Sequence, residues 1–251
     1  MPDPAPLPVT ADLDVATGPA PESGSVDRRL ALIQQKLVEQ WEVAPFPRLA
    51  ETPADNGHPD HAIDNPYWQF LRLMPRAGLE PQDQWAVAFS ASVRDLLVRT
   101  YASSIPSPAD IRWIVDLLAG RDLLEVGAGS GYWAWQLRQA GIDVIAVDNR
   151  STRWDHMWTD VDYGNTADAS LHADRALMLI HPPHESSMAQ TALDFYDGDL
   201  LVFAGDETTA ASRIFHATLA RGWEEIAAAA HHPTYVGIPC RLRAFRRRSP
   251  R

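Results

Sequence analysis

The sequence has little of what disulfide-stabilised, membrane-spanning or nucleic-acid-binding proteins need. Cys240 is its single cysteine, which excludes an intramolecular disulfide and fits a reducing, cytoplasmic location. No apolar run approaches the roughly 20 residues that span a bilayer. The net charge of −11 opposes non-specific binding to nucleic acid, which requires positive charge to displace counterions. These features favour a small molecule as the partner, rather than a membrane or a nucleic acid.

Positive charge is absent from the start of the chain and concentrated at its end. Residues 1–24 contain no Lys or Arg, no apolar core and six prolines. We expect a disordered leader that is neither a signal nor a transit peptide. The last 11 residues carry six arginines and no acid. They are either the solvated end of a final strand or a tail that binds an acidic partner.

Residues 25–106 have the spacing of a helical N-terminal cap. Apolar residues recur at helical intervals over 26–41, and further helices are predicted at about 62–73 and 83–101. Between them, residues 45–60 are rich in Pro, Asp and Asn, which indicates a loop.

Residues 107–251 alternate short apolar runs with helical stretches. Ser107 is a predicted N-cap, followed by Pro108 at the first helical position and Asp110 in the first turn of a helix that ends before Gly120. Alternating strands and helices imply crossovers and a parallel sheet covered on both faces. The predicted strands are 123–126, 144–147, 176–180 and 200–204, and the predicted helices are 132–140, 187–196 and 208–220.

The last two apolar segments, 223–230 and 238–245, have no helix between them. A loop with Pro233 and Gly237 joins them, so we expect an antiparallel hairpin. The predicted fold is α/β. It is a Rossmann-like, doubly wound, mostly parallel seven-stranded sheet with a C-terminal antiparallel hairpin and an N-terminal helical cap.

A glycine-rich turn follows the first predicted strand. Glu125 lies in that strand, and Gly127, Gly129 and Gly131 follow at alternate positions. Glycine permits a tight turn and a close approach to a ligand, and ligands bind at the carboxyl edge of such sheets. Asp148 closes the next strand, 17 positions after Gly131, where a carboxylate accepts hydrogen bonds from ribose hydroxyls.

The glycine spacing favours a nucleoside without phosphate over a dinucleotide. A dinucleotide fingerprint has the form G-x-G-x-x-G, because the pyrophosphate must reach the helix N-terminus. Tyr132 occupies the place of the third glycine of that fingerprint. The alternative interpretation is a structural glycine turn followed by a solvated aspartate.

From Gly127 to Asp148 the sequence resembles motif I and the second-strand acid of class I S-adenosylmethionine (SAM)-dependent methyltransferases. The similarity extends over about residues 98–247. His181-Pro182-Pro183 stands where a poorly characterised methyltransferase-like group usually has Trp-Pro-Pro. Some amino-methylating enzymes have Asp/Asn-Pro-Pro-aromatic at this place, and the two histidines at 181 and 184 do not match that pattern.

The resemblance implies SAM as cofactor and methyl transfer to a small-molecule acceptor, such as a specialised metabolite. It implies a SAM-binding domain over 107–251. Tyr101 either closes over the cofactor or packs in the core. The other implied cofactor-binding residues are Glu125 at the methionine amino group, Gly127, Gly129 and Gly131 beside the methionine and adenosine parts, Asp148 at the ribose, and Asn149 and Gly164 beside the adenine.

His181 is the predicted catalytic base or substrate hydrogen-bond partner. It follows the predicted strand 176–180, where the sheet meets the substrate, and imidazole titrates near neutral pH. The alternative is a histidine that bonds a backbone carbonyl beside the Pro-Pro turn. His184 is a second catalytic candidate. The histidines and Cys240 match no strong zinc spacing, so no metal site is predicted.

Two other function classes stay open. One is an enzyme that uses SAM for cyclisation or for transfer of the aminocarboxypropyl group, which releases methylthioadenosine. The other is a non-catalytic SAM-binding protein, because an intact glycine turn and Asp148 indicate binding rather than turnover.

Overall fold

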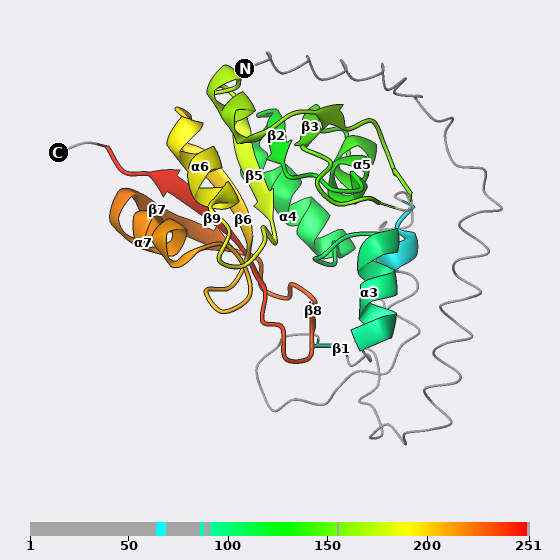
Figure 1. The fold of residues 1–251 in the computed structure, drawn as a ribbon. Coiled ribbons are helices and arrows are strands. Elements are labelled where there is room, and N and C mark those ends of the chain that lie inside the picture. The colour runs from blue at the N-terminus through cyan, green and yellow to red at the C-terminus, as the bar shows by residue number, and fades with distance from the viewer. Residues whose placement is uncertain (1–63, 69–85, 88–90, 155, 250–251) are drawn as a thin grey trace, which may run out of the picture.

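The computed structural model describes residues 64–68, 86–87, 91–154 and 156–249 (Figure 1). The predicted leader, the predicted helix over 26–41 and the predicted loop over 45–60 lie outside these residues. Within them, strands from residue 108 onward are separated in most cases by a helix.

A seven-stranded sheet forms the centre of the described part of the chain (Figure 1). Its strands are β2 (Leu123–Val126), β3 (Val144–Asp148), β4 (Asp162–Tyr163), β5 (Ala176–Ile180), β6 (Leu200–Gly205), β7 (Trp223–Ala228) and β9 (Arg241–Arg247). Their order is β4-β3-β2-β5-β6-β9-β7. The first five pair in parallel, and β9 runs antiparallel to both of its neighbours. The mixed, mostly parallel α/β fold is therefore confirmed.

In the described ranges, residues 66–68 are helical, and six longer helices accompany the sheet. They are α3 (Ala91–Thr100), α4 (Pro108–Leu118), α5 (Tyr132–Gln139), the 3-10 helix η2 (Thr166–Leu171), α6 (Met188–Phe195) and α7 (Arg213–Gly222). Among the described residues, no helix combines the length and the apolar character needed to cross a bilayer.

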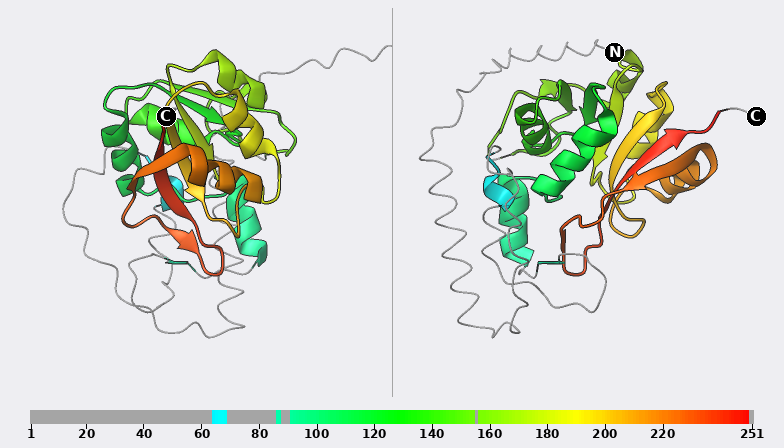
Figure 2. Two further views of the ribbon diagram at one scale, coloured as in Figure 1. Left: turned by 90° about the vertical axis from the view of Figure 1, so that its left-hand side faces the viewer. Right: turned by 180° about the vertical axis from the view of Figure 1, so that it is seen from behind.

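Side chains along the strands pack alternately into two hydrophobic cores, one on each face of the sheet. Leu123 packs in the core with α4 and α5, whereas Leu124 and Val126 pack in the core with α6 and α7. Successive strand side chains point to opposite faces, so a continuous apolar run requires helices on both. Figure 2 shows α4 and α5 on one side of the sheet and α6 and α7 on the other.

The start of α4 follows the predicted cap. Ser107 Oγ accepts a hydrogen bond from Asp110 N at 3.1 Å, and Ser107 N donates to Asp110 Oδ2 at 2.9 Å. This reciprocal capping box satisfies two N–H groups that a helix start would otherwise leave unpaired.

The prediction of a continuous helix over 83–101 was wrong in its first part. Ala86–Val87 form strand β1, which pairs in parallel with β8 (Thr234–Tyr235), and α3 begins only at Ala91. The partner of β1 comes from the far end of the chain, and such a tertiary contact overrides local helical spacing.

Helix α7 also begins later than the predicted residue 208. Asp206 Oδ1 accepts hydrogen bonds from Thr208 N at 3.0 Å and from Thr208 Oγ1 at 2.7 Å. An aspartate that bonds the backbone two residues ahead stabilises a turn in competition with a helix. Ser212 then caps α7 by accepting from Phe215 N at 3.3 Å.

Strands β7 and β9 form the predicted antiparallel hairpin, although β9 starts at Arg241 rather than at residue 238. Pro239 cannot donate a ladder hydrogen bond, and a bridge between Tyr235 and Ile238 occupies the connection. Strand β9 inserts between β6 and β7. The dinucleotide-binding order 3-2-1-4-5-6 has no such antiparallel insertion.

Three of the C-terminal arginines, Arg243, Arg247 and Arg248, contact the folded domain. The Arg243 guanidinium lies over the Phe203 ring at 5.6 Å, and that of Arg247 lies over the Trp223 ring at 4.5 Å. Arg248 Nε donates to the Trp223 carbonyl at 3.0 Å. These contacts favour the strand interpretation of the basic segment.

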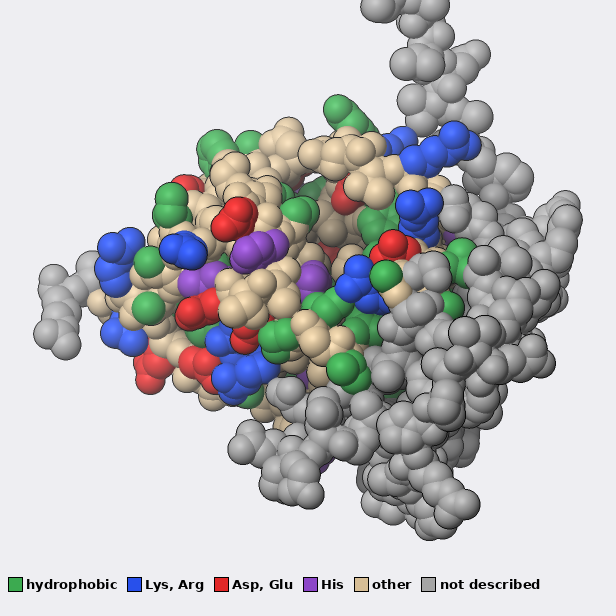
Figure 3. Space-filling model, turned by 60° about the horizontal axis from the view of Figure 1, so that its bottom comes forward, with side chains coloured by type: hydrophobic (Ala, Val, Ile, Leu, Met, Phe, Trp, Pro, Cys, Tyr) green, Lys and Arg blue, Asp and Glu red, His purple; other side chains and the backbone are tan. Residues whose placement is uncertain are grey.

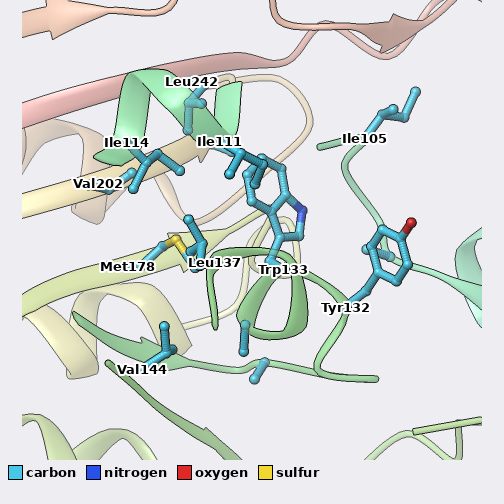
Figure 4. Close-up of a cluster of buried hydrophobic side chains, with 14 of the residues drawn as sticks. Ile105, Ile111, Ile114, Tyr132, Trp133, Leu137, Val144, Met178, Val202 and Leu242 are labelled. Carbon is cyan, nitrogen blue, oxygen red and sulfur yellow. The ribbon is translucent and has the colours of Figure 1, made fainter. Parts of the chain in front are cut away.

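Trp133, the second residue of α5, lies at the centre of one core. Its side chain is buried, and its Nε1 donates to the carbonyl of Ser104 at 3.1 Å. Figure 4 shows its indole beside Ile111, with Met178 and Val202 of the sheet in the same cluster. This packing fixes the start of the helix that follows the glycine turn.

We expect Ser107→Ala to lower the free energy of unfolding by about 1–2 kcal/mol, because the capping box of α4 is lost. Urea denaturation measures the change. Ser170→Ala is the control, since Ser170 is exposed and its Oγ donates only to the Ala167 carbonyl. A surface change of this kind alters stability by at most about 0.5 kcal/mol. Equal losses in the two variants would contradict the stabilising role of the capping box.

Candidate functional site

A cavity of about 520 Å³ lies at the carboxyl edge of the parallel strands. This volume suits a small-molecule ligand. Figure 3 turns this edge of the molecule toward the viewer and shows a hollow with histidine and acidic side chains nearby. Seven of the predicted site residues line the cavity, namely Glu125, Gly127, Gly129, Asp148, Asn149, Gly164 and His181.

Three glycines of the turn from β2 into α5 have positive φ angles, and two of them, Gly127 and Gly129, line the cavity. Gly127 and Gly129 have φ angles of 77° and 58°, a region that other residues adopt only with strain. A Cβ atom at Gly127 would collide with the Met188 side chain, and one at Gly129 would lie 2.6 Å from the Trp154 ring. The backbone is therefore closely covered on the side that lines the cavity.

The N–H groups of this turn are bonded within the protein. Gly127 N and Ala128 N donate to the Val147 carbonyl at 2.8 and 3.0 Å. Gly129 N donates to Asp148 Oδ2 at 3.0 Å. A phosphate-binding turn presents such groups to the anion instead. These three donors already have protein acceptors, so the turn differs from a phosphate cradle.

Glu125 is a buried carboxyl group on the wall of the cavity. Its side chain is 1% exposed, and its Oε2 has no hydrogen-bond partner among the described residues. Burial raises the pKa of Glu125 to about 8, aided by the charge of Asp148 and opposed by the Ala134 N–H and by Arg138. An unpartnered buried acid beside a cavity suits a ligand that brings a hydrogen-bond donor or a positive charge.

Asp148 links the end of β3 to the glycine turn. Its Oδ2 accepts from Gly129 N at 3.0 Å, and its Oδ1 accepts from Arg150 N at 2.6 Å. A carboxylate has about four lone-pair sites, so each oxygen can accept a further hydrogen bond from a ligand hydroxyl. Asn149 is exposed at the same wall, and its Oδ1 accepts from Ser151 N at 3.0 Å.

Sequence reasoning missed two side chains that cover the glycine turn. The Trp154 ring packs against Gly129, and its buried Nε1 has no partner among the described residues. The methyl group of Met188, at the start of α6, lies against Gly127. No local pattern in the sequence places Trp154 or Met188 at the turn. Their positions depend on loop paths rather than on local periodicity.

Three predicted site residues lie outside the cavity lining. Tyr101 is buried, and its ring stacks on Tyr67 at 4.6 Å and on Trp158 at 5.5 Å, which fits its core alternative. Gly131 is the N-cap of α5, and its backbone lies against Val161 and Thr159. His184 is exposed, three residues beyond His181. The structure thus brings His181, but not His184, to the cavity with the glycine turn.

His181 has an unusual backbone conformation for a non-glycine residue. Its φ angle is 45°, and its N–H donates to the Ala204 carbonyl at 2.8 Å. Its ring Nε2 is buried with no partner among the described residues. Burial lowers the pKa of His181, and the positive charges of His232 and Arg94 lower it further, against a raising interaction with its own backbone. A neutral imidazole of this kind can accept a proton near pH 7.

No protein-family model matches the sequence, and no curated protein matches it. Solved structures with some similarity include a protein of the NADB-Rossmann superfamily from Streptococcus agalactiae, at 16% identity and a TM-score of 0.39, covering 58% of this chain and 70% of that one. Magnesium protoporphyrin IX methyltransferase from Synechocystis with bound SAM has 14% identity and a TM-score of 0.38, covering 64% and 85%.

The N-methyltransferase NodS from Bradyrhizobium japonicum has 15% identity and a TM-score of 0.32, covering 57% of this chain and 98% of its own. Identities and scores this low identify no activity. The function must therefore be argued from the geometry of the cavity itself.

The pKa of Glu125 predicts a pH dependence of stability. Its folded-state value of about 8 lies above the ordinary 4.5, so its contribution to stability is complete below pH 4.5 and is lost as pH rises toward 8. We expect the free energy of unfolding of the wild type to fall over this range relative to that of Glu125→Gln, which does not titrate. Urea denaturation at several pH values measures it. Parallel stability curves for the two proteins would show that Glu125 titrates normally.

Proposed function

We propose that the protein binds SAM across the glycine turn and transfers its methyl group to a small-molecule acceptor, as a class I SAM-dependent methyltransferase. One observation carries the proposal. Two carboxyl groups, Glu125 and Asp148, line a cavity around a glycine turn whose N–H groups are largely bonded within the protein.

This arrangement favours a phosphate-free nucleoside over a dinucleotide. A pyrophosphate would lie beside two acidic side chains and would find the N–H groups of Gly127, Ala128 and Gly129 already bonded. SAM brings no phosphate. It carries a sulfonium and an ammonium group, which acidic side chains in a cavity favour.

Each end of the proposed cofactor has a counterpart in the cavity. Asp148 retains acceptor capacity on both oxygens and would bind the two ribose hydroxyls. The unpartnered Oε2 of Glu125 would accept from the methionine amino group, directly or through water. Asn149 and Gly164, which line the same wall, would border the adenine.

SAM supplies an electrophilic methyl group, so the chemical demand on the protein is small. The residues have to align the acceptor in line with the methyl and exclude water. His181 lines the cavity after β5, two strands from Asp148 in the sheet order, which leaves room for an acceptor between them. We assign His181 the role of accepting a proton from the acceptor when its nucleophile must lose one.

The domain division belongs to the same proposal. Residues 107–251 would form the cofactor-binding domain, and residues 25–106 would form a helical cap beside it. The residues that line the cavity support this division, because Val98 and Ala102 line the same cavity as the glycine turn. A cytoplasmic location is proposed on the single cysteine, Cys240.

Calorimetric titration tests the proposal. We expect SAM and S-adenosylhomocysteine to bind and NAD to show no binding. Gly129→Ala should weaken SAM binding at least about tenfold, or ~1.4 kcal/mol, because the new Cβ displaces Trp154 and the turn.

The matched control is Gly141→Ala. Gly141 also has a positive φ, of 87°, but has no atom within 4 Å of an added Cβ and lies outside the cavity lining. Both variants carry the same kind of backbone penalty, so only Gly129→Ala should lose affinity. Equal SAM affinities in the two variants, or an equal preference of the wild type for NAD, would overturn the proposal.

Products identified by mass spectrometry separate the reactions. S-adenosylhomocysteine together with a methylated acceptor supports methyl transfer. Methylthioadenosine would instead identify cyclisation or aminocarboxypropyl transfer. SAM binding without turnover over a broad acceptor panel would favour a non-catalytic protein.

His181→Ala should lower kcat about 100-fold or more with an acceptor that must lose a proton, while the Kd for SAM stays within about twofold. Steady-state kinetics and calorimetry measure the two quantities. His172→Ala is the control, because His172 follows η2 and lies outside the cavity lining. Unchanged turnover in His181→Ala would remove this residue from the mechanism.

A further inference from the structure

A buried polar cluster lies behind the acceptor side of the cavity. His232 Nδ1 is 3.0 Å from Asp110 Oδ2, and His232 Nε2 is 2.9 Å from Ser104 Oγ and 3.5 Å from Cys240 Sγ. Each of these four residues is 4% exposed or less. The proposed reaction uses none of these residues directly. Burying polar groups costs free energy, so we expect a structural role for them.

The carboxyl group of Asp110 is buried at the start of a helix. Its Oδ2 accepts from Ser107 N at 2.9 Å and from Ser107 Oγ at 2.8 Å, at the positive N-terminal end of α4. A buried carboxylate requires a compensating charge, and His232 is the basic group in contact with it. Burial alone lowers the pKa of His232, but Asp110 and Cys240 outweigh this and raise it to about 10.

Ser104 or Cys240, His232 and Asp110 follow the order of a nucleophile, a base and an orienting acid. All four residues are nevertheless buried. The hollow that Ser104 and Cys240 line has a volume of about 10 Å³, which is about the space of one water molecule. Neither Ser104 Oγ nor Cys240 Sγ can therefore meet a substrate. A role in holding the neighbouring wall is the remaining physical use of the cluster.

Two connections lead from the cluster to the main cavity. The Ser104 carbonyl accepts from Trp133 Nε1 at 3.1 Å, and both Trp133 and the adjacent Ser103 line the main cavity. Ser104, Cys240 and His181 together line the small hollow, while His181 also lines the main one. His181 thus stands between the proposed acceptor and the His232 cluster.

We propose that Asp110 and His232 are positioning residues, a buried carboxylate–imidazolium pair that holds the acceptor wall and keeps His181 in its proton-accepting state. This role rests on the proposed function only where it concerns turnover. The effect of the His232 charge on the pKa of His181 does not depend on any ligand.

The charges around His181 support this role. His232, from the connection between β7 and β8, and Arg94, from α3, both disfavour a second positive charge on His181. The carboxyl groups of Glu125 and Asp148 line the same main cavity, at its cofactor side. Removing the charge of His232 should therefore make His181 easier to protonate.

NMR titration of the histidine rings in the full chain without ligand tests the proposal. In His232→Gln, the pKa of His181 should rise by at least about half a pH unit, since a neighbouring positive charge is lost. His216→Gln is the control. His216 is a partly buried histidine bonded to the Ala210 carbonyl in the other core, and its loss should leave His181 unchanged. An unchanged pKa of His181 in His232→Gln overturns the proposal.

A measurement on the wild type covers the case in which His232→Gln does not fold. At pH 7, the nitrogen chemical shifts of His232 should show both ring nitrogens protonated, and a neutral His232 ring overturns the proposal. With an acceptor in hand, the acidic limb of the kcat profile should shift to higher pH in His232→Gln while the Kd for SAM is retained. If SAM fails to bind while the NMR results are as expected, the proposed function is wrong, but the role of Asp110 and His232 is retained.

Discussion

The site depends on one hydrogen bond, from the backbone N–H of Gly129 to the carboxylate of Asp148. It joins the ends of two adjacent parallel strands, β2 and β3, at the edge of the sheet where ligands bind. The carboxylate accepts from a turn N–H group of the kind that binds phosphate in dinucleotide-binding proteins. Because the acidic side chain of Asp148 already accepts from this N–H group, the cavity suits a ligand with hydroxyl donors or positive charge.

Two other acids show how burial decides the use of a carboxyl group. Asp110 has three hydrogen-bond donors, including His232, and belongs to the framework. Glu125 is equally buried but keeps one oxygen without a partner beside the cavity. A buried acid is costly unless it is paired, which is why we propose that a ligand pairs with Glu125.

The segment before the sheet is tied to the glycine turn by polar and aromatic contacts. Asn65 Nδ2 donates to the Pro106 carbonyl at 2.8 Å, and Tyr67 N donates to Tyr132 Oη at 3.0 Å. Ser130, within the turn, donates to the carbonyl of Tyr101. The aromatic cluster of Tyr67, Tyr101 and Tyr132 therefore connects the segment before the sheet to the turn.

The sequence by itself determined the sheet, the glycine turn and the acid that follows it. These features are local, since strand runs such as Leu123–Val126, the cap at Ser107 and the glycine spacing each act within a few residues. The tertiary structure decided what distant segments bring together. Examples are the pairing of β1 with β8, the cover of Trp154 on Gly129 and the contact between Asp110 and His232, 122 positions apart. Such contacts depend on loop paths and on the burial of charge, which only the folded chain defines.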